Sequence, residues 1–541
     1  MSDQDAARDD RRGAVGYVVG AATPDPATAR GGSGRESADR DARPEVAPLG
    51  GTLRRGAAIS SVTLVLVQAT SLVTTLLLAR LLSPQEVGVY AAGTILTGFL
   101  VMFAEGGMKG ALIQRPTDVE DAAATVFWAT AGTGVLMSLA ALAAAPLVGL
   151  LFRDPLAAEI AAVTSGMLLM QALTNVPDGL LQREFNFKRR LIVDPLRSLG
   201  FGVVAVALAA AGFGVWSLAI GNYVSMALWL IGTWALGRWR PGRGRPSYRL
   251  WRELARFAFP LLIQSVVWQI REAGQAAIVG RFLGTAALGQ FRYGRRVGLL
   301  PAQAVVQVGS YVLFPAFSRL AGDPDRLKVA FLRSLRWLWI SAAPVAGFIV
   351  ALGEPSVVLL LGQRWAEAGV FLVGMAGYGA AIAVKAAAGE AIKGTGHSRL
   401  LNWASATQLV LGLGLVLLAL PFGLFGVGLA ISATEIALAA LVLGLARRVV
   451  GFTLRELFQR LVPPLVAAVA AAAVVGVTDH ALIRSVEHGT TLAGILMLAG
   501  ETVVFAVLYL VVLRMLDRQA VTSMLGAARQ RISRRARRAG P

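Results

Sequence analysis

Apolar stretches of about 20 residues recur along this chain from Ala57 to Leu513, and no other feature constrains its fold as strongly. A helix of that length crosses roughly 30 Å of hydrocarbon, and a helix satisfies its own backbone groups inside lipid. The chain is 55% hydrophobic and 16% charged, whereas a soluble domain is about a quarter charged. We therefore predict an all-α integral membrane protein with about 14 transmembrane helices.

A hairpin sequence occurs twice. Residues 75–93 align with residues 276–294 at a spacing of about 201 residues, which pairs Arg80 with Arg281 and Gly88 with Gly289. Each copy ends one apolar helix and begins the next. Such a repeat predicts two pseudo-symmetric six-helix lobes around a central cavity, with the substrate path between them and a C-terminal helix pair outside the repeat.

The longest loop between spans is rich in Arg, Gly and Pro, and it divides the two predicted lobes. The predicted organisation is a disordered cytoplasmic tail at 1–50, an N-lobe at 51–237, a cytoplasmic linker at 238–256, a C-lobe at 257–446, a basic loop with helices 13 and 14 at 447–514, and a basic cytoplasmic tail at 515–541.

Lysine and arginine are distributed unevenly between alternate loops. One set of loops holds 23 of them and the opposite set holds five, by our count. Because basic loops stay in the cytoplasm, both termini are expected there. The same topology accounts for the net charge of +20 without a nucleic-acid partner. Anionic membrane lipid is a candidate partner of the basic C-terminal tail.

Several predicted spans carry polar side chains, and a charge at the centre of a span costs about 2.5–3.5 kcal/mol. Such groups are expected to face a cavity or a partner. These polar faces predict a wet, basic cavity. Its guanidinium groups would suit an anionic substrate. The candidate residues are Gln68, Lys109, Gln171, Asn175, Gln264, Arg271, Gln275, Arg296 and Gln303.

Structural roles are the alternative for these charges. Arg271 could pair with Glu272 or Glu105, while Arg292 and Arg296 could extend to lipid headgroups. Glu435 falls near the centre of the twelfth predicted span, where a buried carboxyl could carry a coupling proton. It could equally be a neutral, hydrogen-bonded group.

Signals for an enzyme are weak. The chain has no cysteine, and its three histidines fall in predicted loops. The sequence therefore predicts no catalytic residue, no metal site and no cofactor. The expected outer loops are too short to hold the active site of a sugar polymerase or ligase.

Several stretches resemble a known transporter family. They are Leu78-Ala-Arg-Leu-Leu-Ser-Pro-Gln-Glu-Val-Gly-Val-Tyr90, Gly106-Gly-Met-Lys-Gly-Ala-Leu-Ile-Gln-Arg115, Thr125-Val-Phe-Trp128, Leu181-Gln-Arg-Glu-Phe-Asn-Phe-Lys188, Ile278-Val-Gly-Arg-Phe-Leu-Gly284 and Leu313-Phe-Pro-Ala-Phe-Ser318. Together they resemble Wzx-type oligosaccharide flippases of the multidrug/oligosaccharidyl-lipid/polysaccharide exporter superfamily. Spans nine to fourteen match that family only in hydropathy and order.

The resemblance implies a bacterial cytoplasmic-membrane protein with two lobes in a V. It implies a cargo of oligosaccharide on polyprenyl pyrophosphate, turned from the inner to the outer leaflet by alternating access. Arg271, Arg296 and Lys109 would then neutralise the pyrophosphate, and the amides would line the sugar path. Relatives often carry an Asp where this chain has Gln275, so Glu272 becomes a candidate for ion coupling. Polysaccharide polymerase and glycosyltransferases are further candidate partners.

Three other functions remain open. A drug or cation antiporter of the same superfamily would need acids to dominate the cavity. A membrane scaffold that recruits glycosyltransferases would tolerate loss of the intramembrane arginines. A flippase for the peptidoglycan precursor is a close neighbour that the sequence distinguishes poorly.

Overall fold

The computed structural model describes residues 66–105, 107–183, 187–237, 239–308, 312–483, 491–519 and 522. The predicted tail at 1–50 lies outside this range, as does most of the predicted tail at 515–541. All regular secondary structure in the described ranges is helical, which confirms the all-α prediction there.

The helices follow one another with short connections. In chain order they are Leu66–Leu81, α2 (Pro84–Gly93), α3 (Ile95–Glu105), α4 (Met108–Gln114), α5 (Val119–Phe152), α6 (Pro155–Thr164), α7 (Gly166–Arg183), α8 (Phe187–Ala210), α9 (Val215–Leu236), α10 (Tyr248–Leu283), α11 (Thr285–Val308), α12 (Phe314–Leu320), α13 (Pro324–Leu361), α14 (Ala366–Gly374), α15 (Ala376–Gly394), α16 (Leu401–Ala419), α17 (Gly423–Val450), α18 (Leu454–Thr478) and α19 (Leu492–Leu516).

The chain is a multi-pass membrane protein. Nine helical segments in the described ranges are long and apolar enough to cross a membrane, and ten if the bent pair Gln363–Gly374 and Ala376–Gly394 is one span. One of the nine segments, Ser398–Val450, contains the two helices α16 and α17. They pack against each other on either side of a turn at Gly423, which has a φ of +61°. The predicted count of 14 stays a prediction.

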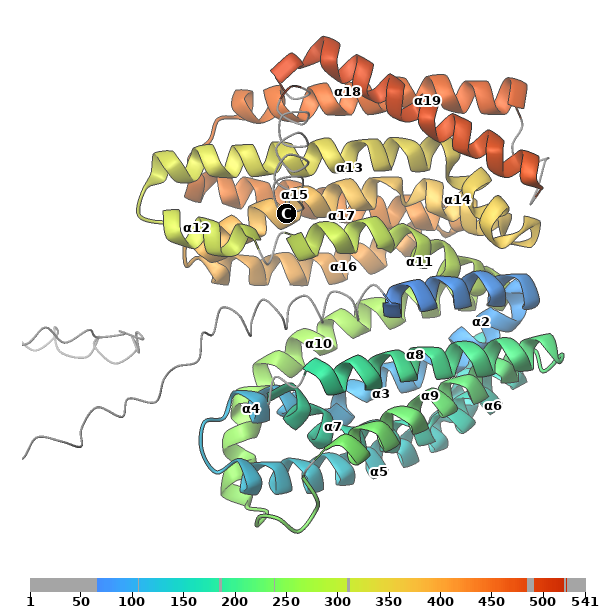
Figure 1. The fold of residues 1–541 in the computed structure, drawn as a ribbon, viewed down its shortest axis with the longest axis vertical. Coiled ribbons are helices and arrows are strands. Elements are labelled where there is room, and N and C mark those ends of the chain that lie inside the picture. Colours follow the sequence, from blue (N-terminus) through green and yellow to red (C-terminus); the bar gives the residue numbers. More distant parts are fainter. Residues whose placement is uncertain are drawn as a thin grey trace, which may run out of the picture. The chain divides into compact units, whose positions relative to one another are not determined.

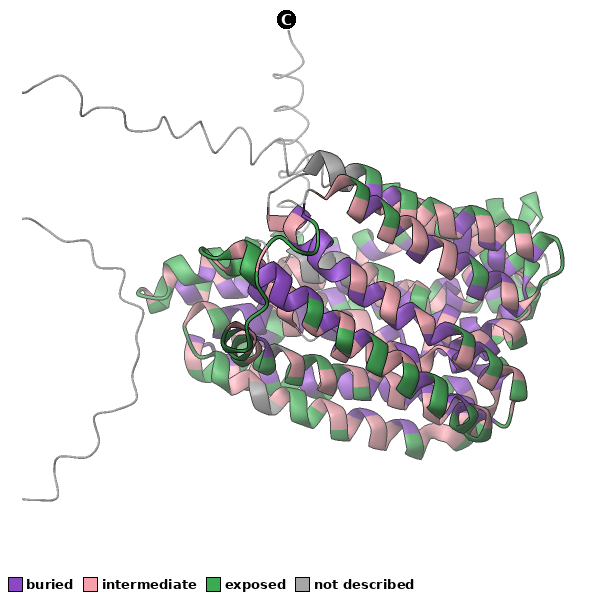
Figure 2. Cartoon of the chain, turned by 90° about the horizontal axis from the view of Figure 1, so that it is seen from below, coloured by how far each residue is buried: buried purple, intermediate pink, exposed green. Residues whose placement is uncertain are grey.

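Exposed apolar side chains cover the outward surfaces of the helices. Leu150 on α5 is 73% exposed and Val410 on α16 is 75% exposed, and exposed positions run along many helices in Figure 2. Apolar surface on this scale marks contact with lipid or a partner. In a chain with repeated membrane-length helices, it is the surface that the hydrocarbon covers.

The helices form two groups. In one, α3 and α5 to α9 pack on one another. In the other, α11 packs on α14 and α15, α13 packs on α15 and α18, and α19 packs on α18. Figure 1 shows α10 running between these groups, where it contacts α3 and α5 on one side and α11 and α16 on the other. This arrangement makes α10 the element through which both groups share one site.

The two copies of the repeated hairpin pack directly against each other. Ser83 caps α2 through a reciprocal capping box with Glu86, and Gly284, with a φ of +93°, separates α10 from α11. A Cβ on Gly88 would lie 1.6 Å from the Thr285 carbonyl oxygen, and a Cβ on Gly289 would lie 2.0 Å from the Pro84 carbonyl oxygen. Only glycine allows this approach of α2 to α11. We call this contact the hairpin seam.

A shared apolar core lies at the hairpin seam. It buries Val89 of α2 and Phe152 of α5 together with Leu288 of α11, Phe371 of α14 and Val427 of α17. A neighbouring cluster also joins the two groups, because it buries Leu82 and Ala205 together with Trp365. The clusters around Phe127 and Trp239 and around Phe317 and Phe331 each belong mainly to one group. The seam is therefore the place where both groups are joined by close packing.

The predicted linker at 238–256 is partly helical. Helix α10 begins at Tyr248 rather than near residue 257. Its first turns are stabilised because Leu250 and Leu254 pack beside Trp239 and Phe127. Just before the helix, the backbone N–H groups of Arg245 and Ser247 donate hydrogen bonds to the side chains of Asp121 and Thr125 on α5. Tertiary packing thus extends the helix into a segment whose composition indicated a loop.

Candidate functional site

A cavity of about 490 Å³ lies between the first group of helices and α10 and α11. Its volume is typical of small-ligand pockets, which span roughly 300–1,000 Å³. The lining mixes apolar side chains with polar ones from both repeats. The polar lining side chains are Tyr90, Thr94, Thr97, Gln171, Arg197, Asn222, Gln269, Glu272 and Arg292.

Two arginines enter this cavity from opposite groups of helices. Arg197 comes from α8, where its guanidinium carbon lies 4.3 Å above the ring of Trp229. Arg292 comes from α11, and its Nε is buried without a hydrogen-bond partner. Among the described residues, the ion pairs of this region involve other side chains. Two permanent positive charges are thus available to an anion in the cavity.

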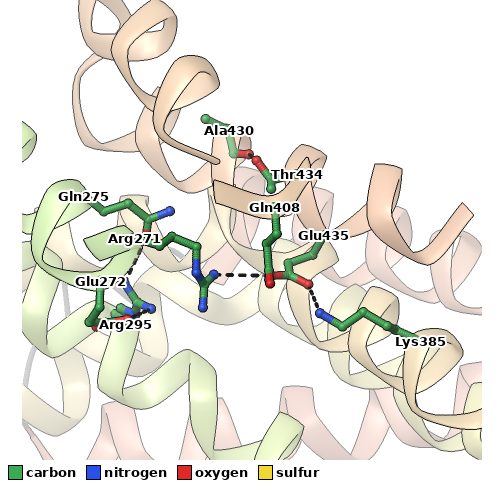
Figure 3. Close-up of polar contacts among 9 residues, drawn as sticks. All are labelled: Arg271, Glu272, Gln275, Arg295, Lys385, Gln408, Ala430, Thr434 and Glu435. Carbon is green, nitrogen blue, oxygen red and sulfur yellow. Dashed lines mark hydrogen bonds and ion pairs between the residues drawn. The ribbon is translucent and has the colours of Figure 1, made fainter. Parts of the chain in front are cut away.

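Glu272 is the acidic side chain of the cavity lining. Its Oε2 lies 2.5 Å from a guanidinium nitrogen of Arg295, and the other terminal nitrogen of Arg295 donates to Gln275 Oε1 at 3.0 Å. Figure 3 shows these three side chains together on one side of the view. Because Arg295 neutralises Glu272, the unpaired charge in the cavity is basic.

A second, deeper network lies among α10, α15, α16 and α17. Arg271 Nη1 lies 3.5 Å from Glu435 Oε1, Gln408 Nε2 donates to the same oxygen at 2.5 Å, and Lys385 pairs with Oε2 (Figure 3). Glu435 is 1% exposed. A buried carboxylate with two cations and an amide is fully paired, which buried charges require.

The first group of helices carries a matching polar network. Gln171 Nε2 donates to Glu105 Oε1 at 2.6 Å, and Asn175 donates to the Ala104 carbonyl oxygen at 3.3 Å. Lys109 pairs with Asp178, which also accepts from Gln182. These contacts tie α3 and α4 to α7.

The predicted site residues are therefore divided among several places. Gln171 and Glu272 line the cavity. Arg271 and Lys109 are paired with acids, and the acid beside Arg271 is Glu435 rather than Glu272 or Glu105. Arg296 is exposed and donates to Ser71 Oγ at 2.5 Å.

The positions of the predicted amide residues differ more from the sequence prediction than those of the charged residues. Gln68 and Gln264 are exposed and lie outside the cavity lining. Asn175 and Gln275 are each 1% exposed, because their side chains are engaged by Ala104 and Arg295. The side chain of Gln303 lies outside the described residues.

Sequence reasoning missed Arg197, Asn222, Lys385 and Gln408, and it left Arg292 open between a polar stripe facing the cavity and a headgroup contact. Lys385 and Arg197 are charges within predicted apolar spans, and that signal alone could have selected them. The pairing of Lys385 with Glu435 had no sequence signal, because the two residues lie on different helices 50 positions apart. Across the described residues, no cluster of acids and histidines is arranged to hold a metal ion.

Residues 77–369 match the family model described as "Polysaccharide biosynthesis protein". The chain is 30% identical over 297 residues to the succinoglycan biosynthesis transport protein ExoT of Rhizobium meliloti (strain 1021), covering 55% of this chain and 60% of that protein. It is 23% identical over 324 residues to the lipopolysaccharide biosynthesis protein WzxC of Escherichia coli (strain K12), covering 57% and 63%. The matches thus span about 60% of the length of these relatives.

Two solved structures share the fold. The lipid II flippase MurJ in an inward closed conformation superposes with a TM-score of 0.68 at 14% identity, covering 85% of this chain and 99% of that one. A multidrug resistance MATE family transporter in an inward-facing conformation gives a TM-score of 0.60 at 16% identity, covering 71% and 94%. These likenesses support the predicted fold class of an all-α membrane transporter.

Proposed function

Because the chain belongs to the polysaccharide biosynthesis protein family, we propose that it moves polyprenyl-pyrophosphate-linked oligosaccharide from the inner to the outer leaflet of the cytoplasmic membrane. The observation that carries this proposal is the cavity between the first group of helices and α10 and α11, because it is lined by Arg197 and Arg292, and neither arginine forms an ion pair among the described residues. The names of two relatives, a succinoglycan biosynthesis transport protein and a lipopolysaccharide biosynthesis protein, agree with such a cargo.

The pyrophosphate is the part of this cargo that needs the arginines. Its charge cannot enter a low-dielectric interior unless cations and hydrogen bonds replace its water. A guanidinium offers paired donors to phosphate oxygens, and Arg292 has a buried Nε without a partner. The amides of Gln171, Asn222 and Gln269 would face sugar hydroxyls beside it.

The paired residues keep the roles expected from the sequence as part of this proposal. Arg271 and Lys109 would exchange their acid partners for the pyrophosphate during transport, and Arg296 would contact it from α11. Glu272 and Glu435 are the candidates for ion coupling, because losing or gaining a proton at either would change the charge seen by Arg295, Arg271 and Lys385.

The hairpin seam would close one end of the path. Gln85 Nε2 donates to Thr285 Oγ1 at 2.7 Å, and Trp365 Nε1 donates to the Ala79 carbonyl oxygen at 2.7 Å. Arg80 donates to the carbonyl oxygens of Leu359 and Leu360. The loops at this end hold few basic residues, so we assign it to the outer leaflet. Alternating access then requires these contacts to open.

Depletion of the protein in its own cells tests the proposal. We expect one polyprenyl-pyrophosphate-linked oligosaccharide to accumulate, measured by mass spectrometry of lipid extracts, with loss of the corresponding surface polymer. An unchanged lipid pool and an unchanged surface would contradict it. Accumulation of the peptidoglycan precursor alone would identify a different lipid-linked cargo.

The charge of the cavity lining argues against the alternative function of a drug or cation antiporter. Its described lining has two arginines and one glutamate, and the glutamate is already paired with Arg295. A cationic drug would therefore meet a net positive site. A scaffold role predicts that Arg197 and Arg292 can be replaced without loss of surface polymer, so the same variants test it.

A further inference from the structure

A second basic cavity lies far along the chain from the site described above. It has a volume of about 520 Å³ and is lined by Val329, Arg333, Arg336, Trp337, Ile340, Arg460 and Gln519. These residues come from the first half of α13, the first turns of α18 and the segment that follows α19.

Three helices change from charged to apolar sequence at this level. Arg336 and Trp337 precede the long apolar part of α13, Arg460 precedes that of α18, and Asp517 follows that of α19. Arginine and tryptophan at such boundaries lie at the depth of lipid headgroups. The cavity therefore opens where the phosphates of the surrounding lipids are found.

The charge of the cavity is only partly balanced. Arg336 pairs with Asp517. The guanidinium of Arg460 donates to the Glu456 carbonyl oxygen at 2.8 Å, and Glu456 Oε1 lies 2.9 Å from Lys328 Nζ. Among the described residues, neither Arg333 nor Arg460 forms an ion pair. Two guanidinium groups thus remain for an anion.

The segment that follows this cavity in the sequence is basic rather than acidic. Residues 520–541, which follow Gln519, contain six arginines and no acid. The apolar wall formed by Val329, Trp337 and Ile340 suits acyl chains beside a charged head. Free phosphate would leave this wall uncovered.

We propose that this cavity binds the phosphate headgroup of an anionic phospholipid. Arg333 and Arg460 contact the phosphate, and the apolar wall contacts the acyl chains. By the orientation assigned from the basic loops, the lipid belongs to the cytoplasmic leaflet, where basic pockets between helices bind anionic headgroups. This site is separate from the cavity lined by Arg197 and Arg292, because the two cavities share no lining residue.

Native mass spectrometry of the full-length protein tests this. Protein is purified from vesicles of equimolar phosphatidylglycerol and phosphatidylcholine, and the retained lipids are counted. We expect wild type to retain phosphatidylglycerol in preference to phosphatidylcholine. In the R333Q/R460Q variant, the ratio of retained phosphatidylglycerol to phosphatidylcholine should fall roughly fivefold for each arginine removed. The matched control R326Q/R455Q removes the same charge from exposed positions on the same two helices, and it should behave as wild type.

Equal retention of phosphatidylglycerol by R333Q/R460Q and wild type would overturn the proposal. Displacement of the bound lipid by polyprenyl diphosphate at lower concentration than by phosphatidylglycerol would also overturn it, because the occupant would then be the carrier lipid. Neither result depends on transport, so a failed flippase assay leaves this test intact.

Discussion

At the scale of single residues, the structure separates charges that are already paired from charges that are available. Arg271 and Lys109 each have an acid partner, whereas Arg292 has a buried Nε without one. The sequence shows that Arg271 lies inside a predicted span, where a charge needs a cavity or a partner. It could not show which acid lies opposite, because Glu435 is 164 positions away on α17. A sequence therefore predicts that a charge needs a partner more readily than which partner it meets.

Replacement of Arg292 with glutamine should reduce transport without unfolding the protein. A hydrogen bond to a charged group contributes about 1.5–3 kcal/mol, so transport should fall by roughly 10- to 150-fold. Arg292→Lys keeps the charge but loses the paired donors, so it should restore only part of the rate. The measurement is the amount of lipid-linked oligosaccharide that accumulates at matched expression, with the exposed Arg326→Gln as the control. Wild-type export by Arg292→Gln would remove this residue from the site.

Replacement of Glu435 with glutamine should destabilise the fold. The change leaves Arg271 and Lys385 without their shared counter-ion, and breaking a buried pair costs about 3–5 kcal/mol. The midpoint of thermal unfolding in detergent should fall, and adding Lys385→Met should recover part of the loss. Glu159→Gln removes an exposed carboxylate from α6 and should leave the midpoint unchanged. An unaltered midpoint in Glu435→Gln would mean that the network contributes little to stability.

At the scale of elements, the repeated hairpin was the most predictable part of the chain. The sequence alone predicted that each copy ends one helix and begins another, and the structure shows α2 beginning at Pro84 and α11 at Thr285. The direct contact of the two copies was not predicted. Their glycines align at a fixed spacing, but only the fold shows that Gly88 and Gly289 face each other's helix.

Replacement of Gly88 with alanine should loosen the hairpin seam. Its Cβ would lie 1.6 Å from the Thr285 carbonyl oxygen, so α2 and α11 must move apart. Because the chain has no native cysteine, a Gln85→Cys/Thr285→Cys pair reports the contact by cross-linking, and its yield should fall when Gly88→Ala is added. Gly132→Ala on α5 meets no atom within 4 Å and is the matched control. An unchanged yield with Gly88→Ala would show that the seam tolerates a side chain there.

At the scale of the whole molecule, hydropathy predicted an all-α membrane protein and the repeated hairpin sequence predicted its two similar halves, because both signals can be read from the sequence without tertiary contacts. The start of α10 at Tyr248 was not predicted, because contacts of Leu250 and Leu254 with distant residues extend that helix. A basic cavity was predicted between the two repeats, and the cavity of about 490 Å³ is lined by residues of both. Its unpaired arginines, Arg197 and Arg292, were identified only once the acid partners of the other charges were known.

The most direct test of the account is transport by purified protein in vesicles with the hairpin seam held shut. The Gln85→Cys/Thr285→Cys variant is reconstituted with lipid-linked oligosaccharide, and movement between leaflets is followed by the access of an impermeant sugar-modifying enzyme. We predict that transport stops when the two cysteines are cross-linked and returns on reduction, while cross-linking reagent alone leaves wild type active. Equal transport with the seam cross-linked and reduced would contradict a path that opens between the two groups of helices.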